Sequence, residues 1–273
     1  MYDRILVPLD GSRFSEEVIP YAAALAGAQG ATLALMRVAI DAGSEGEDRR
    51  YVEKLAATYG AQAVCVPAQA GVAEMVLAEA GNTPATLVAI TSRGRSGVLE
   101  ALLGSVAQQL VRGASGPVLV YHPTGTDRSP TAPVKVRRVV LPLDGSEFSE
   151  AMGADAARFA RWLGAELEVV RVIDADVGAI PGLAAGSGEQ VALESGYVRS
   201  KATQYGKEYG VRVNWDVLHG KPAEAISSYV GGQRDTILAM LTRRQAPLEA
   251  AFLGSVTAGC LRKAGVPILM RLP

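Results

Sequence analysis

The chain has 273 residues, of which 49% are hydrophobic and 20% charged, with a formal net charge of −1. This length is typical of about two domains, and the composition excludes a disordered chain, a nucleic-acid partner and a membrane span. Two cysteines are too few for a disulfide framework or a zinc site, and no signal-peptide pattern is present, so we expect a cytoplasmic protein.

The first half of the chain alternates predicted strands and helices. A strand at Ile5–Leu9 ends in an Asp-Gly turn, and a helix follows from Ser15 to about Ala28, where Pro20 would delay or kink the regular helix. The next predicted elements are, in chain order, strand Thr32–Ile40, helix Tyr51–Tyr59, strand Gln62–Val66, helix Val72–Ala80, strand Ala85–Thr91, a helix from Gly104 to about Arg112, and strand Val118–Tyr121. This alternation predicts a doubly wound α/β sandwich, in which helices cover both faces of a parallel sheet.

The second half repeats the first. Residues 4–16, RILVPLDGSRFSE, recur as RVVLPLDGSEFSE at 138–150, and residues 102–120 recur at 252–270. The offset grows from 134 to 150, because the second copy carries 16 extra residues that predict a longer loop after Val172. The polar stretch 124–135 carries two prolines and is typical of a linker. We therefore predict two domains of one fold, residues 1–123 and 136–273, joined by the linker 124–135.

Polar residues follow the first and fourth predicted strands, at the edge where doubly wound sheets bind ligands. Asp10 could accept hydrogen bonds from a ribose or a base amine, or Asp10-Gly11-Ser12 could serve only as a turn and a helix cap. Arg93 and Arg95 could pair with phosphate oxygens, or could be solvated loop charges. Both interpretations remain open on the residues alone.

Gly104 and Ser105 begin the helix after the fourth strand, where free main-chain N–H groups and the helix dipole favour an anion. An ordinary helix cap is the alternative. The pattern indicates a phosphate-bearing ligand, although the P-loop, the GxGxxG fingerprint and the nucleophile elbow are all missing. His122 and His219 follow strand-like segments, and we expect them to lie at the surface or to pack at strand ends. We predict no catalytic residue and no metal site.

These motifs resemble those of a tandem universal stress protein. The resemblance covers Ile5–Tyr121 and Val139–Met270, and it is carried by VPLDGS and LPLDGS, the RGRSG loop, LLGSV and FLGSV, and the proline before the last strand. It implies a five-stranded parallel sheet of order 3-2-1-4-5 in each domain. It also implies that the two fifth strands pair within the chain as an intramolecular pseudo-dimer, and it leaves further homo-oligomerisation open.

The resemblance further implies an adenine nucleotide, ATP or else ADP or AMP, with Mg²⁺ as an optional companion. Carried over by position, Asp10 and Val38 would line the adenine, and Pro8, Asp10 and Thr91 would lie near the ribose. The phosphates would be held by Gly94, Gly104, Ser105 and Val106, with Arg93 as a charged neighbour.

The glycine signature of the family is incomplete in both copies. In the first copy Thr91 replaces one glycine, and we expect this change to be tolerated. In the second copy Leu241 and Arg244 replace two glycines, and we expect them to block the site. The leading interpretation is a stress-response protein that binds ATP or another adenine nucleotide in the first domain, while the second domain is mainly structural. The alternatives are a nucleotide-independent scaffold and a slow ATPase with at most weak hydrolysis.

Overall fold

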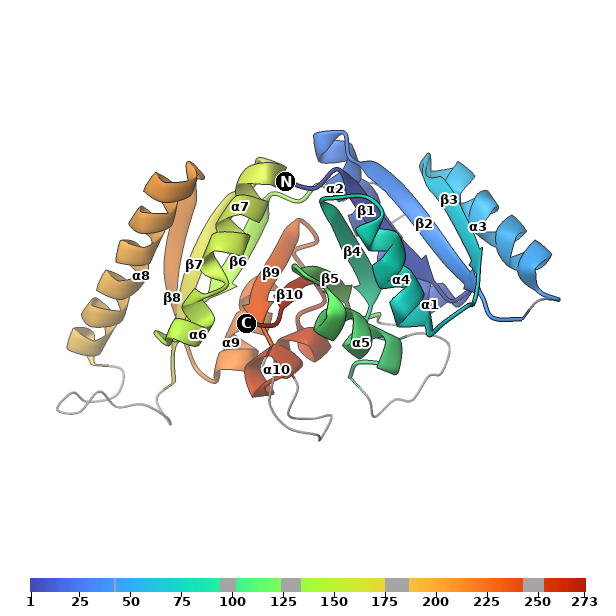
Figure 1. The fold of residues 1–273 in the computed structure, drawn as a ribbon. Coiled ribbons are helices and arrows are strands. Elements are labelled where there is room, and N and C mark those ends of the chain that lie inside the picture. The colour runs from blue at the N-terminus through green and yellow to red at the C-terminus, as the bar shows by residue number, and fades with distance from the viewer. Residues whose placement is uncertain (42, 94–101, 124–133, 175–186, 243–252) are drawn as a thin grey trace. The chain divides into compact units, whose positions relative to one another are not determined.

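The computed structural model describes residues 1–41, 43–93, 102–123, 134–174, 187–242 and 253–273 (Figure 1). The chain divides into two compact units, Met1–Lys135 and Val136–Pro273. The predicted linker 124–135 and the predicted long loop after Val172 lie largely outside the described residues. Both therefore stay predictions.

The first unit contains a parallel sheet with the strand order β3-β2-β1-β4-β5, which confirms the predicted order. Its strands are β1 (Arg4–Leu9), β2 (Thr32–Ala39), β3 (Gln62–Pro67), β4 (Thr86–Thr91) and β5 (Val118–Tyr121). In the central strand β1, the side chains of Ile5, Leu6 and Val7 are fully buried. Successive side chains of a strand point to opposite faces, so this burial requires cover on both faces of the sheet.

The helices of the first unit are α1 (Arg13–Glu16), α2 (Ile19–Gln29), α3 (Glu45–Tyr59), α4 (Val72–Gly81) and α5 (Ser105–Gly113). In Figure 1, α4 crosses in front of the strands of this unit and α2 lies behind them. Pro20 lies in the first turn of α2, where its missing N–H removes no helical hydrogen bond. The regular helix α2 therefore begins late, at Ile19, which agrees with the first of the two predicted alternatives, and α1 stands as a separate short helix.

Helix α3 begins at Glu45, six residues before the predicted start at Tyr51. Three acidic residues lie in its first turn, where the helix dipole favours negative charge. One of them, Asp48, accepts a hydrogen bond from Nε of Arg37 in β2 at 2.7 Å. This contact between separate elements orders a charged segment that has no clear apolar period in the sequence.

The second unit repeats the architecture, with the strand order β8-β7-β6-β9-β10 and all pairs parallel. Its strands are β6 (Arg138–Pro142), β7 (Glu166–Ile173), β8 (Val213–His219), β9 (Thr236–Leu241) and β10 (Ile268–Arg271). Its helices are α6 (Glu147–Glu150), α7 (Gly153–Leu163), α8 (Gly188–Tyr209), α9 (Pro222–Val230) and α10 (Ser255–Lys263). Helix α7 packs against α8, and α9 packs against α10.

Candidate functional site

A cavity of about 380 Å³ lies where β1, β2 and β4 end, beside the start of α5. Small-molecule sites in proteins enclose roughly 300–1,000 Å³. Eight of the nine predicted site residues line this cavity: Pro8, Asp10, Val38, Thr91, Arg93, Gly104, Ser105 and Val106. The ninth, Gly94, lies outside the described residues. The topology thus brings together residues that lie up to about a hundred positions apart.

Much of the remaining cavity wall is apolar, and it includes Met36, Ile40, Val72, Ile90, Ala107 and Leu110. Ile40 is 65% exposed, although it follows a buried strand. Sequence reasoning missed Ile40 as a site residue, because an isoleucine at the end of an apolar strand has the signature of the core. An exposed apolar side chain beside polar groups suits a ligand with a flat apolar ring.

Asp10 makes the predicted turn and also lines the cavity, and its role in binding a ligand stays a prediction. Its Oδ1 accepts a hydrogen bond from the Ser12 N–H at 2.9 Å and another from the Ser12 hydroxyl at 2.6 Å. Ser12 in turn caps α1, because its Oγ accepts from the N–H of Ser15 at 3.2 Å. The turn fixes the Asp10 carboxylate at the end of β1.

The start of α5 carries no side-chain cap among the residues that the structure describes. The N–H of Gly104 is already committed, since it donates to the carbonyl oxygen of Ser92 at 2.7 Å. The N–H of Gly104 thus joins the start of α5 to the end of β4 in this structure, and its expected role in holding phosphate stays a prediction. Within the described residues, no acceptor is shown for the N–H groups of Ser105 and Val106, and such groups at a helix start favour an anion.

Arg93 lines the cavity as a fixed side chain. Its Nη2 lies 3.1 Å from Nε2 of His122 and donates to the carbonyl oxygen of Pro123 at 3.2 Å. The carbonyl oxygen of Arg93 accepts from the hydroxyl of Thr91 at 2.9 Å. The Thr91 side chain therefore holds the backbone of Arg93 at the end of β4.

A second arginine, Arg37, also lines the cavity, and sequence reasoning did not identify it as a site residue. Its guanidinium pairs with Asp48 and donates to the carbonyl oxygen of Leu9 at 3.3 Å. Arg171 repeats these contacts in the second unit with Glu194 and Leu143. Because its charge is compensated by Asp48, we assign Arg37 to holding the end of β1 in place. Its recurrence in both copies was the signal available in the sequence.

The second unit has a cavity of about 610 Å³ at the corresponding strand ends. Leu241 was expected to help block this site, and that expectation stays a prediction. Its side chain is 5% exposed and forms part of the cavity wall, because it is packed into the sheet at the end of β9. Arg244, the other departure from glycine, lies outside the described residues.

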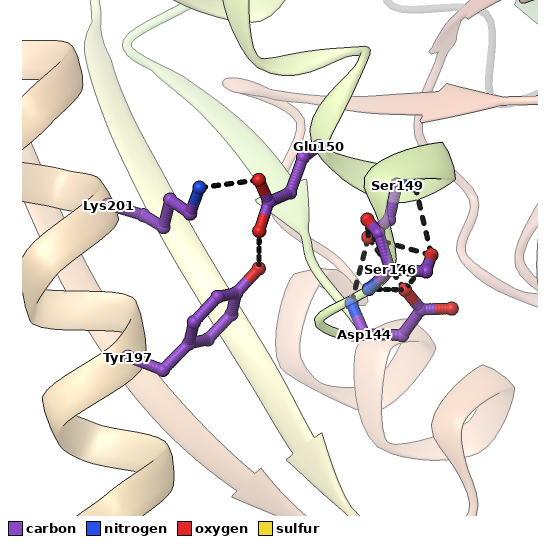
Figure 2. Close-up of polar contacts among 6 residues, drawn as sticks. All are labelled: Asp144, Ser146, Ser149, Glu150, Tyr197 and Lys201. Atoms are coloured by element: carbon purple, nitrogen blue, oxygen red, sulfur yellow. Dashed lines mark hydrogen bonds and ion pairs between the residues drawn. The ribbon is translucent and has the colours of Figure 1, made fainter.

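Asp144 is the counterpart of Asp10, and its Oδ1 accepts hydrogen bonds from the N–H of Ser146 and from the hydroxyl groups of Ser146 and Ser149. Figure 2 shows the hydroxyl groups of Ser146 and Ser149 gathered at one oxygen of this carboxylate. Partial burial raises the pKa of Asp144, but these hydrogen bonds outweigh it and hold the pKa below its usual value. Glu150 points away from this cluster toward α8, where it contacts Tyr197 and Lys201 (Figure 2).

A family model described as the universal stress protein family matches residues 1–122 and again residues 135–270. The chain belongs to the universal stress protein family. The two matches confirm the tandem organisation and account for both cavities as copies of one architecture.

Individual relatives agree with this assignment. The chain is 29% identical over 139 residues to universal stress protein MJ0531 of Methanocaldococcus jannaschii. The aligned region covers 49% of this chain and 81% of that protein. It is also 29% identical over 191 residues to universal stress protein Rv2005c of Mycobacterium tuberculosis, covering 69% of this chain and 62% of the relative. The match thus spans less than two thirds of the mycobacterial relative.

Solved structures share the fold. A universal stress protein from Archaeoglobus fulgidus has a TM-score of 0.68 at 19% identity, covering 100% of this chain and 99% of that one. A further structure, described as a universal stress protein in complex with cAMP, covers 50% of this chain and 97% of that one, with a TM-score of 0.41 at 17% identity.

In the described parts of this universal stress protein, no group of three His, Cys, Asp or Glu side chains is placed to hold a metal ion. In the same residues, no helix is both long and apolar enough to cross a membrane.

The glycines that precede α5 and α10 occupy the same family motif but differ in conformation. Gly104 has φ −67° and ψ 162°, which any residue adopts, whereas Gly254 has φ 73° and ψ 151°, a region essentially restricted to glycine. We expect Gly104→Ala to stabilise the protein by about 0.4–1 kcal/mol, because alanine lowers the conformational entropy of the unfolded chain. Gly254→Ala should destabilise it by about 1–3 kcal/mol. Urea unfolding measures both, and equal effects of the two substitutions would contradict the assignment.

Proposed function

We propose that the first unit binds an adenine nucleotide, with ATP as the leading ligand and ADP or AMP as alternatives, and that the protein acts as a nucleotide-responsive member of its family. The second unit is mainly structural in this proposal. The proposal covers binding and does not include efficient hydrolysis.

The observation that carries the proposal is the composition of the first cavity. One wall supplies apolar side chains such as Ile40 and Val38, which suit an adenine ring. The same cavity holds the Asp10 carboxylate, an acceptor for ribose hydroxyls or a base amine. It also holds the start of α5 and the Arg93 guanidinium, both of which favour a phosphate. These three chemistries together match the three parts of a nucleotide.

ATP is expected to raise the melting temperature of the first unit. A ligand at a hundred times its Kd stabilises the folded state by about 2.7 kcal/mol, which corresponds to roughly 8 °C for a unit of this size. Asp10→Ala should abolish most of that rise, because it removes the acceptor at the end of β1. Differential scanning calorimetry with ATP, ADP and AMP measures the shift.

Asp144→Ala is the matched control for this experiment. It removes the same turn carboxylate from the second unit, where Asp144 accepts from Ser146 as Asp10 accepts from Ser12. We expect Asp144→Ala to leave the ATP-dependent shift unchanged. If none of the three nucleotides shifts the wild-type melting temperature, the protein is better described as a nucleotide-independent scaffold.

Three further parts of the proposal rest on the sequence and the resemblance. Mg²⁺ would accompany ATP through the phosphate oxygens, which are its preferred ligands. Pairing of the two fifth strands within the chain remains a prediction. A cytoplasmic location is proposed from the small number of cysteines, Cys65 and Cys260, which are both free thiols.

A further inference from the structure

Two arginines in the described part of the chain line the first cavity, Arg37 and Arg93. Arg37 is paired with Asp48, whereas Arg93 has no carboxylate partner among the described residues. The His122 ring contacts Arg93. Its Nε2 lies 3.1 Å from Nη2 of Arg93, and its Nδ1 lies 2.7 Å from the hydroxyl of Ser92. A guanidinium can only donate hydrogen bonds, so Nε2 must be the acceptor in this contact. The imidazole is therefore neutral, with its proton on Nδ1, and it donates to Ser92.

Ser92 connects this histidine to the start of α5. The residue is fully buried, and its N–H donates to the carbonyl oxygen of Tyr121 at 2.7 Å. Its own carbonyl oxygen accepts from the N–H of Gly104 at 2.7 Å. One imidazole thus contacts Arg93 directly and, through Ser92, the residue that precedes the N–H donors of α5.

The second unit shows that the fold does not need this histidine. Leu272 stands at the position of His122, and Thr242 stands at the position of Ser92. The N–H of Thr242 still donates to the carbonyl oxygen of Arg271 at 2.9 Å, as the N–H of Ser92 does to Tyr121. The Thr242 hydroxyl contacts the same carbonyl oxygen at 3.4 Å instead of a ring nitrogen. The same strand ends therefore form with a leucine in place of the imidazole.

We propose that His122 is a positioning residue for phosphate binding in the first cavity: it holds the Arg93 guanidinium at the cavity wall. His122 does not line the cavity itself, so it acts through Arg93. The guanidinium is fixed by two acceptors, His122 Nε2 and the Pro123 carbonyl oxygen, before any ligand arrives. A preorganised donor binds an anion more tightly than a mobile one, because less side-chain entropy is lost on binding. The inference deepens the proposed function, since it concerns the same cavity.

The test compares two substitutions of His122 by residues with a side-chain amide, which differ in the length of the side chain. In His122→Gln the side-chain oxygen can take the place of Nε2 and accept from Arg93. In His122→Asn the amide can reach Ser92 but is too short to reach Arg93. Isothermal titration with inorganic tripolyphosphate on the full chain measures the effect, with ATP and adenosine titrated in parallel. His219→Leu, at the end of β8 in the second unit, is the control histidine.

We expect His122→Asn and His122→Leu to weaken tripolyphosphate binding by about fivefold, and His122→Gln and His219→Leu to change it by less than about twofold. Adenosine affinity should not change in any of them. In an Arg93→Leu background, His122→Asn should have no further effect, because a positioning residue acts only through its partner.

Three results would overturn the inference: wild-type protein that does not bind tripolyphosphate, equal losses in the Gln and Asn variants, or an additive loss in the Arg93→Leu background. Failure of the proposed function gives a different result. If ATP does not bind but tripolyphosphate does, and His122→Asn weakens it, the nucleotide assignment is wrong while the role of His122 stands.

Discussion

Replacing Gly104 by glutamate is expected to weaken ATP binding to the first unit by at least about 100-fold. The substitution places a carboxylate at the start of α5, where the N–H groups of Ser105 and Val106 would meet the phosphates. Two like charges about 4 Å apart repel by about 4 kcal/mol at an effective dielectric constant near 20, and 100-fold corresponds to about 2.7 kcal/mol. Titration calorimetry with ATP measures the change.

Gly104→Ala separates this electrostatic effect from the loss of a glycine. A Cβ at this position would lie 3.6 Å from the carbonyl oxygen of Ser92, an ordinary contact distance. The backbone conformation is also open to alanine. The alanine variant should therefore keep most of the ATP affinity. If Gly104→Glu binds ATP as well as Gly104→Ala does, the phosphates do not lie at the start of α5.

Gly153→Ala is expected to destabilise the second unit by about 2–3 kcal/mol. A Cβ on Gly153 would overlap the hydroxyl oxygen and the Cζ of Tyr205. Tyr205 comes from α8, is 5% exposed, and its pKa is raised to about 12, chiefly by burial. Its ring cannot rotate into solvent without leaving a cavity in the packed region. Overpacking of this kind costs about 1–3 kcal/mol of folding stability. Denaturant unfolding of the full chain measures the loss.

Gly113→Ala provides a control with a similar apparent clash. Its Cβ would lie 2.5 Å from Cδ1 of Leu77, the end of a flexible side chain that can rotate away. Alanine also favours the helix over glycine by about 1 kcal/mol, so the net change should be small. The double variant Gly153→Ala with Tyr205→Leu should recover part of the loss. Without such recovery, the contact between α7 and α8 is not the cause.

The sequence contained enough information for the repeat, the order of strands and helices, and the location of the cavity. These features follow from local patterns: near-continuous apolar runs mark buried parallel strands, and a glycine-rich loop marks the helix start after β4. Because the carboxyl ends of parallel strands meet at one edge, Asp10 and Arg93 could be placed together without coordinates. The two family matches then settled the tandem organisation.

Contacts between residues far apart in the chain decided the remaining features. The early start of α3 depends on an ion pair between Arg37 and Asp48, and the role of His122 depends on an arginine 29 positions away. The commitment of the Gly104 N–H to Ser92 could not be predicted either, because it requires the start of α5 to lie against the end of β4. The sequence by itself determined the repeated α/β architecture, since periodicity is a local property of the chain. Only the tertiary structure decided which hydrogen-bond donors and charges remain for a ligand, because hydrogen bonds between residues distant in the sequence occupy the others.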